Sequence, residues 1–170
     1  IRIISVITNI AAESLRILNE KLKQRELHKL YLCVVIGTPK EKQGLLKDYL
    51  QKNEKQNKVY VSNQKTADSK EISTKYKVLA SKNGLSLVEI ELLTGRTHQI
   101  RAHMSSFGHP LLGDGKYGRN AVNKLFNIKY QCLYSYKLTF NIENEKSPLY
   151  YLNKKTFEIV ILETKKPSTN

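Results

Sequence analysis

Acidic residues are scarce in this sequence relative to basic ones. The 170 residues include 15 Asp plus Glu against 29 Lys plus Arg, which gives a formal net charge of +14. A basic excess of this size favours a polyanionic partner, with nucleic acid ahead of a membrane surface. Because the basic residues are dispersed and lysine also promotes solubility, the charge alone indicates such a partner without proving it.

Cysteine and long apolar runs are also scarce. Cys33 and Cys132 are the only two cysteines, and they lie in apolar strand patterns without CxxC spacing. They are too few for a disulfide framework, so we predict buried free thiols in a reducing compartment. No apolar run could cross a membrane and no signal-peptide pattern occurs. The sequence therefore predicts a cytoplasmic protein, which we expect to be a monomer.

The signatures of several enzyme classes are missing. There is no Gly-x-Ser-x-Gly elbow, no phosphate-binding loop and no GxGxxG. No motif therefore supports a serine hydrolase or an enzyme with a nucleotide cofactor. His98, His103 and His109 lack the i, i+4 pair of a zinc-binding helix, and no carboxylate stands in ligand register. We therefore expect neither a metal nor another cofactor.

Apolar periodicity predicts an α+β fold, in which helices flank a large, mixed but mainly antiparallel sheet. We expect one domain over residues 1–164 and a frayed tail over 165–170. Lys82-Asn83-Gly84 predicts a hairpin turn, and Leu45 to Leu50 predicts one or two helical turns. Strands are expected at 1–7, 28–37, 59–61, 71–80, 85–93 and 130–142, with a last hairpin from 149–152 and 156–162. Helices are expected at 9–26 and 120–127.

The densest group of polar side chains lies between Leu92 and Met104, which reads Leu-Leu-Thr-Gly-Arg-Thr-His-Gln-Ile-Arg-Ala-His-Met. Ile100, Met104 and Phe107 recur at i, i+4 and i+7, which predicts a short helix with one apolar face. Glycine and proline at 108 and 110 should end that helix.

Arg101 stands beside this apolar stripe, so we expect the core to hold it at an edge from which it could point into a cleft. Arg96, Gln99 and His103 share a neighbouring face of the helix. A solvated basic face is an equally good interpretation of these residue types taken alone. For His98 and His103, hydrogen bonds to phosphate and a purely structural role are both open.

Only three aspartates occur, and none is an obvious catalyst. Asp48 lies in the expected helical turns and Asp68 in a polar loop. Asp114 stands in Leu-Gly-Asp-Gly, where turn-forming neighbours predict hydrogen bonds to the local backbone. We therefore expect Arg101 to lack a carboxylate partner within residues 1–170.

Two motifs give a specific resemblance. Leu-Thr-Gly-Arg-Thr-His-Gln-Ile-Arg-x-His-Met, followed by Gly-His-Pro-Leu-Leu-Gly-Asp-x-x-Tyr-Gly, resembles the signature of the RluA-like family, the large-ribosomal-subunit type of RNA pseudouridine synthases. The resemblance implies isomerisation of specific uridines in ribosomal or transfer RNA to pseudouridine, without a cofactor. The base is flipped from its stack, the glycosidic bond is broken, and the ring is rejoined through C5.

The same resemblance implies roles for individual residues. Arg101 matches the family's arginine that pairs with the catalytic aspartate, and Tyr31 matches the tyrosine that packs on the target uracil. Arg96, His98, Gln99 and His103 would contact RNA or the backbone of the site. The family's catalytic loop, His-Arg-Leu-Asp-x-x-Thr-Ser-Gly, is absent from the sequence, so we expect the aspartate upstream of Ile1.

Two other classes of function remain as alternatives. A non-catalytic RNA-binding homologue would use the same cleft and have no aspartate before Ile1. A metal-dependent or histidine-dependent hydrolase acting on RNA or nucleotides is the less favoured alternative, and it would reveal itself by metal content and by cleavage of the substrate.

Overall fold

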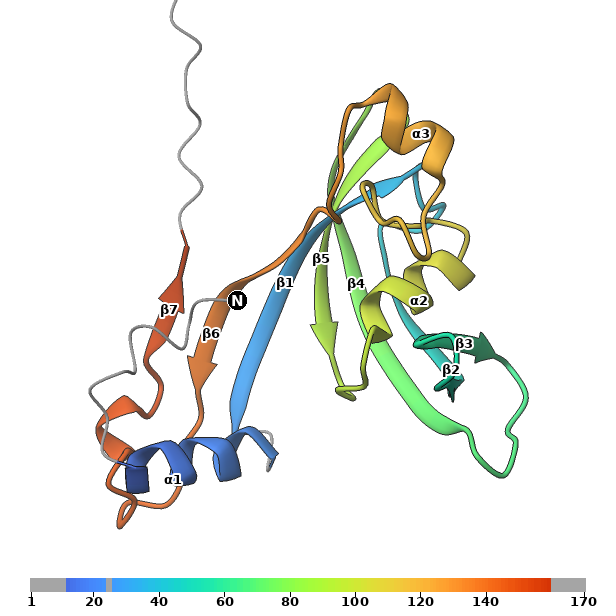
Figure 1. The fold of residues 1–170 in the computed structure, drawn as a ribbon. Helices are drawn as coiled ribbons and strands as arrows, with labels where there is room; N and C mark the ends of the chain where they lie inside the picture. The colour runs from blue at the N-terminus through green and yellow to red at the C-terminus, as the bar shows by residue number, and fades with distance from the viewer. Residues whose placement is uncertain (1–11, 24–25, 160–170) are drawn as a thin grey trace, which may run out of the picture. The chain divides into compact units, whose positions relative to one another are not determined.

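The computed structural model describes residues 12–23 and 26–159, which belong to two compact units (Figure 1). The larger unit is formed by residues 29–135, and the smaller by the described residues before 29 and after 135. The strand expected at 1–7, the end of the strand expected at 156–162 and the tail at 165–170 fall outside the described residues. No helix in the described part is long and apolar enough to cross a membrane. The single domain expected over 1–164 stays a prediction.

The larger unit is built on a sheet with the strand order β3-β2-β4-β5-β1. Its strands are β1 (Leu27–Ile36, which begins in the smaller unit), β2 (Gln43–Asn53), β3 (Lys58–Ser62), β4 (Lys70–Lys82) and β5 (Leu85–Leu92). Each of their pairings is antiparallel. Asn83 and Gly84 join β4 to β5 with φ of 53° and 72°, as a two-residue hairpin turn requires. The mainly antiparallel sheet and this turn are confirmed.

The prediction of helical turns between Leu45 and Leu50 is wrong, because β2 is a continuous strand paired with β3 and β4. The adjacent leucines mimic a helical repeat, but they lie on opposite faces of the sheet. Leu46 packs against the main core, whereas Leu45 is 45% exposed. An apolar side chain on each face of a strand therefore produced the misleading pattern.

Two helices belong to the larger unit, as predicted. The helix α2 (Gln99–Ser106) follows β5 directly, and α3 (Asn120–Leu125) lies further along the chain (Figure 1). Ile100 and Met104 of α2 are buried in a core with Val35, Val88 and Ile90 from the sheet. The apolar stripe predicted for this helix thus holds it against one face of the sheet.

The smaller unit contains α1 (Ala12–Lys23), β6 (Leu133–Phe140, which begins in the larger unit), the 3-10 turn η2 (Tyr150–Leu152) and β7 (Thr156–Glu158). Leu18 of α1 packs with Leu138, Phe140 and Ile142, which confirms the predicted helix over residues 12–23 and the buried side of β6 at Leu138 and Phe140. The hairpin expected between 149–152 and 156–162 is wrong. Residues 150–152 form η2 instead, and β7 pairs with β6.

Candidate active site

The turn from β5 into α2 brings the predicted polar residues to the end of a strand. His98 occupies the position before the first residue of α2, with φ of 56° in the left-handed region. This conformation is uncommon for a residue other than glycine, and it redirects the chain from the strand into the helix. Because the apolar side of α2 faces the core, Arg101 comes to lie on its flank with 16% of its side chain exposed.

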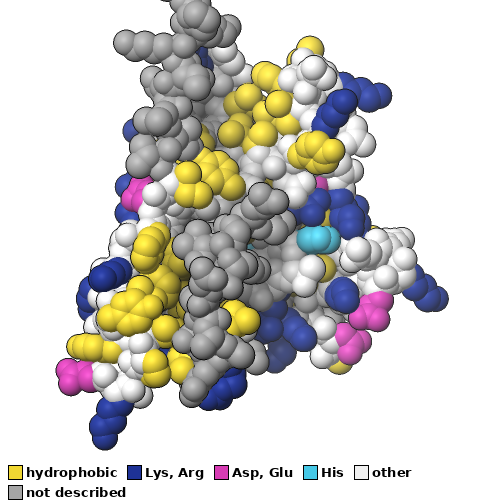
Figure 2. Space-filling view, turned by 60° about the vertical axis from the view of Figure 1, so that its left-hand side comes forward, with side chains coloured by type: hydrophobic (Ala, Val, Ile, Leu, Met, Phe, Trp, Pro, Cys, Tyr) yellow, Lys and Arg dark blue, Asp and Glu magenta, His cyan; other side chains and the backbone are white. Residues whose placement is uncertain are grey.

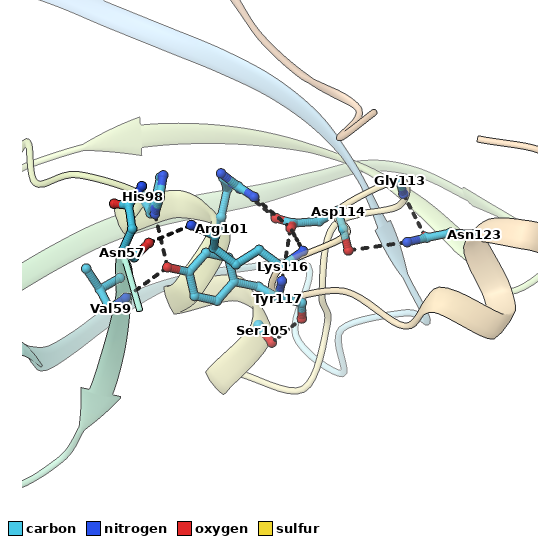
Figure 3. Close-up of polar contacts among 10 residues, drawn as sticks. All are labelled: Asn57, Val59, His98, Arg101, Ser105, Gly113, Asp114, Lys116, Tyr117 and Asn123. Carbon is cyan, nitrogen blue, oxygen red and sulfur yellow. Dashed lines mark hydrogen bonds and ion pairs between the residues drawn. The ribbon is translucent and has the colours of Figure 1, made fainter. Parts of the chain in front are cut away.

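Arg101 is held by a carboxylate that the sequence did not lead us to expect as its partner (Figure 3). Its Nε donates to Oδ2 of Asp114 at 2.7 Å, and its Nη2 donates to Oδ1 at 2.8 Å. This two-pronged geometry fixes both the position and the plane of the guanidinium group. The expectation that Arg101 lacks a carboxylate partner within the chain is therefore wrong. Within residues 12–23 and 26–159, Nη1 of Arg101 has no hydrogen-bond partner.

Asp114 itself is completely buried and saturated with donors. Its Oδ1 also accepts from the backbone N–H groups of Lys116 at 2.8 Å and Tyr117 at 3.0 Å, which confirms the predicted local bonds. Burial would raise the pKa of its carboxyl, but the bonds from Arg101, Tyr117 and Lys116 outweigh burial and lower that pKa. Asp114 is therefore ionised, and the same pairing raises the pKa of Arg101.

Tyr117 connects this ion pair to His98. Its hydroxyl accepts from the backbone N–H of Val59 at 2.9 Å and lies 3.0 Å from Nδ1 of His98. Burial, followed by the nearby charges of Arg101 and Lys116, lowers the pKa of His98, so the imidazole is neutral at pH 7. The hydroxyl proton is then available to Nδ1, which leaves the imidazole proton on Nε2. The ring of Tyr117 also lies 5.2 Å from Cζ of Arg101.

Gln99 faces the opposite way and is buried. Its Oε1 accepts from the hydroxyl of Thr94 at 2.9 Å and from the backbone N–H of Arg96 at 3.1 Å. Its Nε2 donates to the carbonyl of Ser73 at 3.1 Å and to the hydroxyl of Thr74 at 3.0 Å. All four bonds are internal, so this side chain ties α2 and the preceding turn to β4.

His103 is buried one helical turn further on. Its Nε2 lies 3.0 Å from Oδ2 of Asp48 on β2, and its Nδ1 lies 2.9 Å from the hydroxyl of Thr74 on β4. A carboxylate can only accept, so Nε2 carries the proton and Nδ1 accepts from Thr74. Burial lowers the pKa of His103 and outweighs the opposing bond and charge of Asp48, so the ring is neutral at pH 7.

The loop that carries Asp114 is held in place by close packing of its backbone. A Cβ atom on Gly113 would meet the backbone oxygen of Tyr130 at 2.0 Å, and one on Gly118 would meet that of Asp114 at 2.2 Å. Asn123 of α3 is buried and accepts from the N–H of Gly113 at 2.8 Å, while its amide donates to the carbonyl of Asp114 at 3.3 Å. Two obligatory glycines and one buried amide thus fix the carboxylate that holds Arg101.

The predicted site residues separate into two groups. Arg101 and His98 meet through Tyr117, and Arg96 is exposed in the turn before α2. Gln99 and His103 have buried side chains with internal partners, which favours the structural role left open for His103 over contact with RNA.

Tyr31 lies half-buried on β1, on the face that α2 covers, where burial raises the pKa of its hydroxyl. Across the described ranges, no three His, Cys, Asp or Glu side chains gather as metal ligands.

Comparisons with known sequences agree on one family. A profile of the RNA pseudouridylate synthase family matches residues 7–106. An uncharacterized RNA pseudouridine synthase of Mycoplasma genitalium is 35% identical over 145 residues, covering 81% of this chain and 43% of that protein. The ribosomal large subunit pseudouridine synthase D of Borreliella burgdorferi is 31% identical over 131 residues, covering 76% of this chain and 38% of that protein. The chain thus spans less than half the length of either relative.

A solved structure supports the same fold. The human RNA pseudouridylate synthase domain containing 1 superposes with a TM-score of 0.68 at 23% sequence identity, covering 91% of this chain and 69% of that one. At this identity the match concerns the fold alone. It is consistent with the antiparallel sheet and the position of α2 described above.

Proposed function

Since this chain belongs to the RNA pseudouridylate synthase family, we propose that the protein isomerises specific uridines in RNA to pseudouridine. The observation that carries the proposal is the two-pronged pairing of Arg101 with a buried, ionised Asp114. This pairing presents a fixed cationic group at the edge of the core. Its remaining nitrogen, Nη1, is available to a second carboxylate or to the substrate.

The proposed reaction rearranges bonds without an external reactant. The bond between C1′ of the ribose and N1 of the uracil breaks, and a bond between C1′ and C5 forms. A proton leaves C5, and N1 of the released base gains one. The base must leave its stack to be reached, which requires a pocket with a basic rim. Arg96 in the exposed turn and Nε2 of His98 are our candidates for contacts at that rim.

Asp114 is poorly suited to act as the nucleophile in this reaction. Both of its oxygens are engaged by Arg101, and one also accepts two backbone N–H groups. Asp48 is bonded to His103. We therefore assign Asp114 to positioning Arg101, and we propose that the catalytic aspartate is encoded upstream of Ile1 and pairs with Nη1.

Tyr31 is our candidate for contact with the target base. It projects from β1, and the neighbouring Cys33 and Val35 on the same face are buried under α2. A tyrosine supported in this way offers a rigid ring for stacking on uracil. Burial raises the pKa of its hydroxyl, so the group is neutral at pH 7 and can take part in the proton transfer at C5.

The proposal is tested by tritium release from RNA labelled at C5 of uridine, using the full-length protein. Arg101→Ala should lower the single-turnover rate by roughly 10²- to 10⁴-fold, because it removes the charge that supports the reacting carboxylate. Arg96→Ala is the matched control, and it should weaken RNA binding while preserving most of the rate at saturating RNA. Full activity of Arg101→Ala would assign the catalytic role to another residue, with Arg96 next in line.

The runner-up function is a non-catalytic RNA-binding homologue. Two observations together would favour it. The wild-type protein would bind RNA but release no tritium, and the coding sequence would have no aspartate shortly before Ile1. Cleavage of the RNA in the same assay would instead indicate a hydrolase.

A further inference from the structure

A second surface lies beside the Asp114 loop, around α3. Its sequence contains basic residues but no acidic ones. Between Asp114 and Glu143 the chain contains no acidic residue, while Arg119, Lys124 and Lys129 fall within or next to α3. Positive charge without acidic residues nearby in the sequence attracts a polyanion.

This surface is hollowed, and most of the residues that line the hollow are asparagines and lysines. A hollow of about 390 Å³ is lined by Gly113, Gly115, Asn120, Lys124, Asn127 and Lys129, together with Asn123 and Ile128. The side chains of Asn120, Lys124, Asn127 and Lys129 are exposed. Amide groups can both donate to and accept from the edge of a nucleobase, and the two ammonium groups can bind its phosphate.

Two large side chains follow residues of the hollow directly in the sequence. Tyr130 follows Lys129 directly and is 81% exposed, and Leu125 of α3 is 81% exposed. Figure 2 shows hydrophobic side chains beside Lys and Arg at the end of the larger unit where α3 lies. An exposed aromatic ring flanked by basic residues is the combination that binds unpaired bases by stacking.

The hollow is joined to the proposed active site through main-chain packing. Gly113 and Gly115, which line it, are the neighbours of Asp114, and Asn123 bonds both Gly113 and Asp114. A Cβ on Gly113 would also meet the side chain of Ile128 at 2.5 Å, so this wall has little room to move. The wall of the hollow formed by Gly113 therefore lies at a fixed offset from Asp114 and Arg101.

We propose that this hollow binds an unpaired nucleotide of the substrate RNA next to the target uridine. In this arrangement Lys124 and Lys129 contact the phosphate, Asn120 and Asn127 contact the base edge, and Tyr130 stacks on a neighbouring base. The inference rests on the proposed function, because it takes the RNA at this site to be the substrate. These residues would recognise the RNA sequence or the loop shape around the target uridine.

The first test is RNA affinity of the full-length protein, measured by fluorescence anisotropy with a labelled single-stranded oligouridylate. Tyr130→Ala should weaken binding by about 5- to 100-fold, and Tyr130→Phe should retain it, because stacking needs the ring and not the hydroxyl. The double change Lys124→Ala with Lys129→Ala should lower the log-log salt slope by about one to two. Matched controls are Tyr151→Ala and Lys82→Ala, whose side chains are exposed elsewhere.

The second test is activity, with Asn120→Ala combined with Asn127→Gly. Asn127 has φ of 53°, so glycine removes the amide without straining the backbone. We expect a higher KM for unmodified ribosomal RNA transcripts with little change in kcat, and an unchanged melting temperature. The inference is overturned if the variants at positions 120, 124, 127, 129 and 130 all bind and react like the wild type while Arg101→Ala is inactive. That outcome leaves the proposed function standing.

Two further outcomes separate the possibilities. A wild-type protein that neither binds nor converts RNA would remove the proposed function, whatever the α3 variants do. If the lysine and tyrosine variants bind RNA normally but Leu125→Ser changes the sedimentation coefficient, the surface contacts protein and the inference is wrong.

Discussion

The two polar sides of α2 contain similar residue types but have opposite surroundings. On the inner side, Gln99 and His103 are buried and bond only to groups inside the protein. On the outer side, Arg101 and His98 bond to the Asp114–Tyr117 loop and keep part of their surface exposed. Histidines and long polar side chains thus occur on both sides of one short helix.

At this helix, burial and not residue type separates the residues that have only internal partners from those that we propose for the active site. The inner bonds fix where α2 lies on the sheet, and a buried amide or imidazole with all partners satisfied is stable there. The outer bonds fix where the guanidinium points. Each side can be disrupted separately, which allows the comparison to be tested.

The largest effect is expected from Asp114→Asn. Replacing the buried carboxylate leaves Arg101 without its counter-charge, which should cost about 3–5 kcal/mol of unfolding free energy. Misplacement of Arg101 should also lower the rate of pseudouridine formation by roughly 10²-fold or more. Urea denaturation and tritium release measure the two effects, and Asp68→Asn in the exposed loop is the control.

The pH dependence of this variant adds a check. The pKa of Asp114 is lowered on folding, so its stabilisation is complete above the ordinary value of 3.8 and is lost as the pH falls through the lower folded pKa. The stability gap between wild type and Asp114→Asn should therefore close in acid. A constant gap would mean that shape and not charge holds Arg101.

The sequence predicted β1, β4, β5 and the amphipathic helix, because their apolar side chains repeat with a clear period, but it did not predict β2, which carries Asp48. It also placed Arg101 at the edge of the core. It did not predict the Arg101–Asp114 pair, since the two residues are 13 positions apart and Leu-Gly-Asp-Gly is explained equally well by local turns. The burial of Gln99 was not predicted, and the structural role left open for His103 could not be decided, because their partners Thr74 and Asp48 lie on strands distant in sequence.

The second prediction addresses the inner side. Gln99→Met keeps the length of the side chain but removes its four hydrogen bonds, which leaves the N–H of Arg96 without its acceptor, while the hydroxyls of Thr74 and Thr94 keep His103 and Ser73 as partners. We expect a loss of about 2–4 kcal/mol in unfolding free energy, because four internal hydrogen bonds of about 0.5–1.5 kcal/mol each are lost. Activity per folded molecule at saturating RNA should change by only a few-fold. Thermal unfolding measures the loss, and exposed Gln64→Met should have no effect.

A third prediction concerns the hydroxyl of Tyr117, the residue that connects His98 to Arg101 on the outer side of α2. Tyr117→Phe removes the acceptor of the buried Val59 N–H and the partner of His98, which should cost about 1–2 kcal/mol. The ring beside Arg101 remains, so the reaction rate should stay within a few-fold of the wild type. Denaturation with Tyr151→Phe as control measures the cost. A rate as low as that of Arg101→Ala would place the hydroxyl in the chemistry.

The smallest effect is expected for the pH dependence contributed by His103. Its pKa is lowered in the folded protein from an ordinary 6.5, so at mildly acid pH the unfolded chain binds a proton that the folded chain does not. Unfolding free energy should therefore fall as the pH drops below about 6.5, by at most about 1.4 kcal/mol per pH unit. His98 shifts in the same direction, so the wild type retains some slope from that residue.

His103→Gln removes this titration and should flatten the stability profile between roughly pH 6.5 and 5. The comparison requires urea denaturation of wild type and variant at several pH values, with His98→Gln measured in parallel. Because His98 is partly exposed, its replacement should change the slope less than that of His103. If His103→Gln kept the full wild-type slope, His103 would take up its proton equally in the folded and unfolded states. The inner side of α2 would then be open to solvent, and the contrast between the two sides would fail.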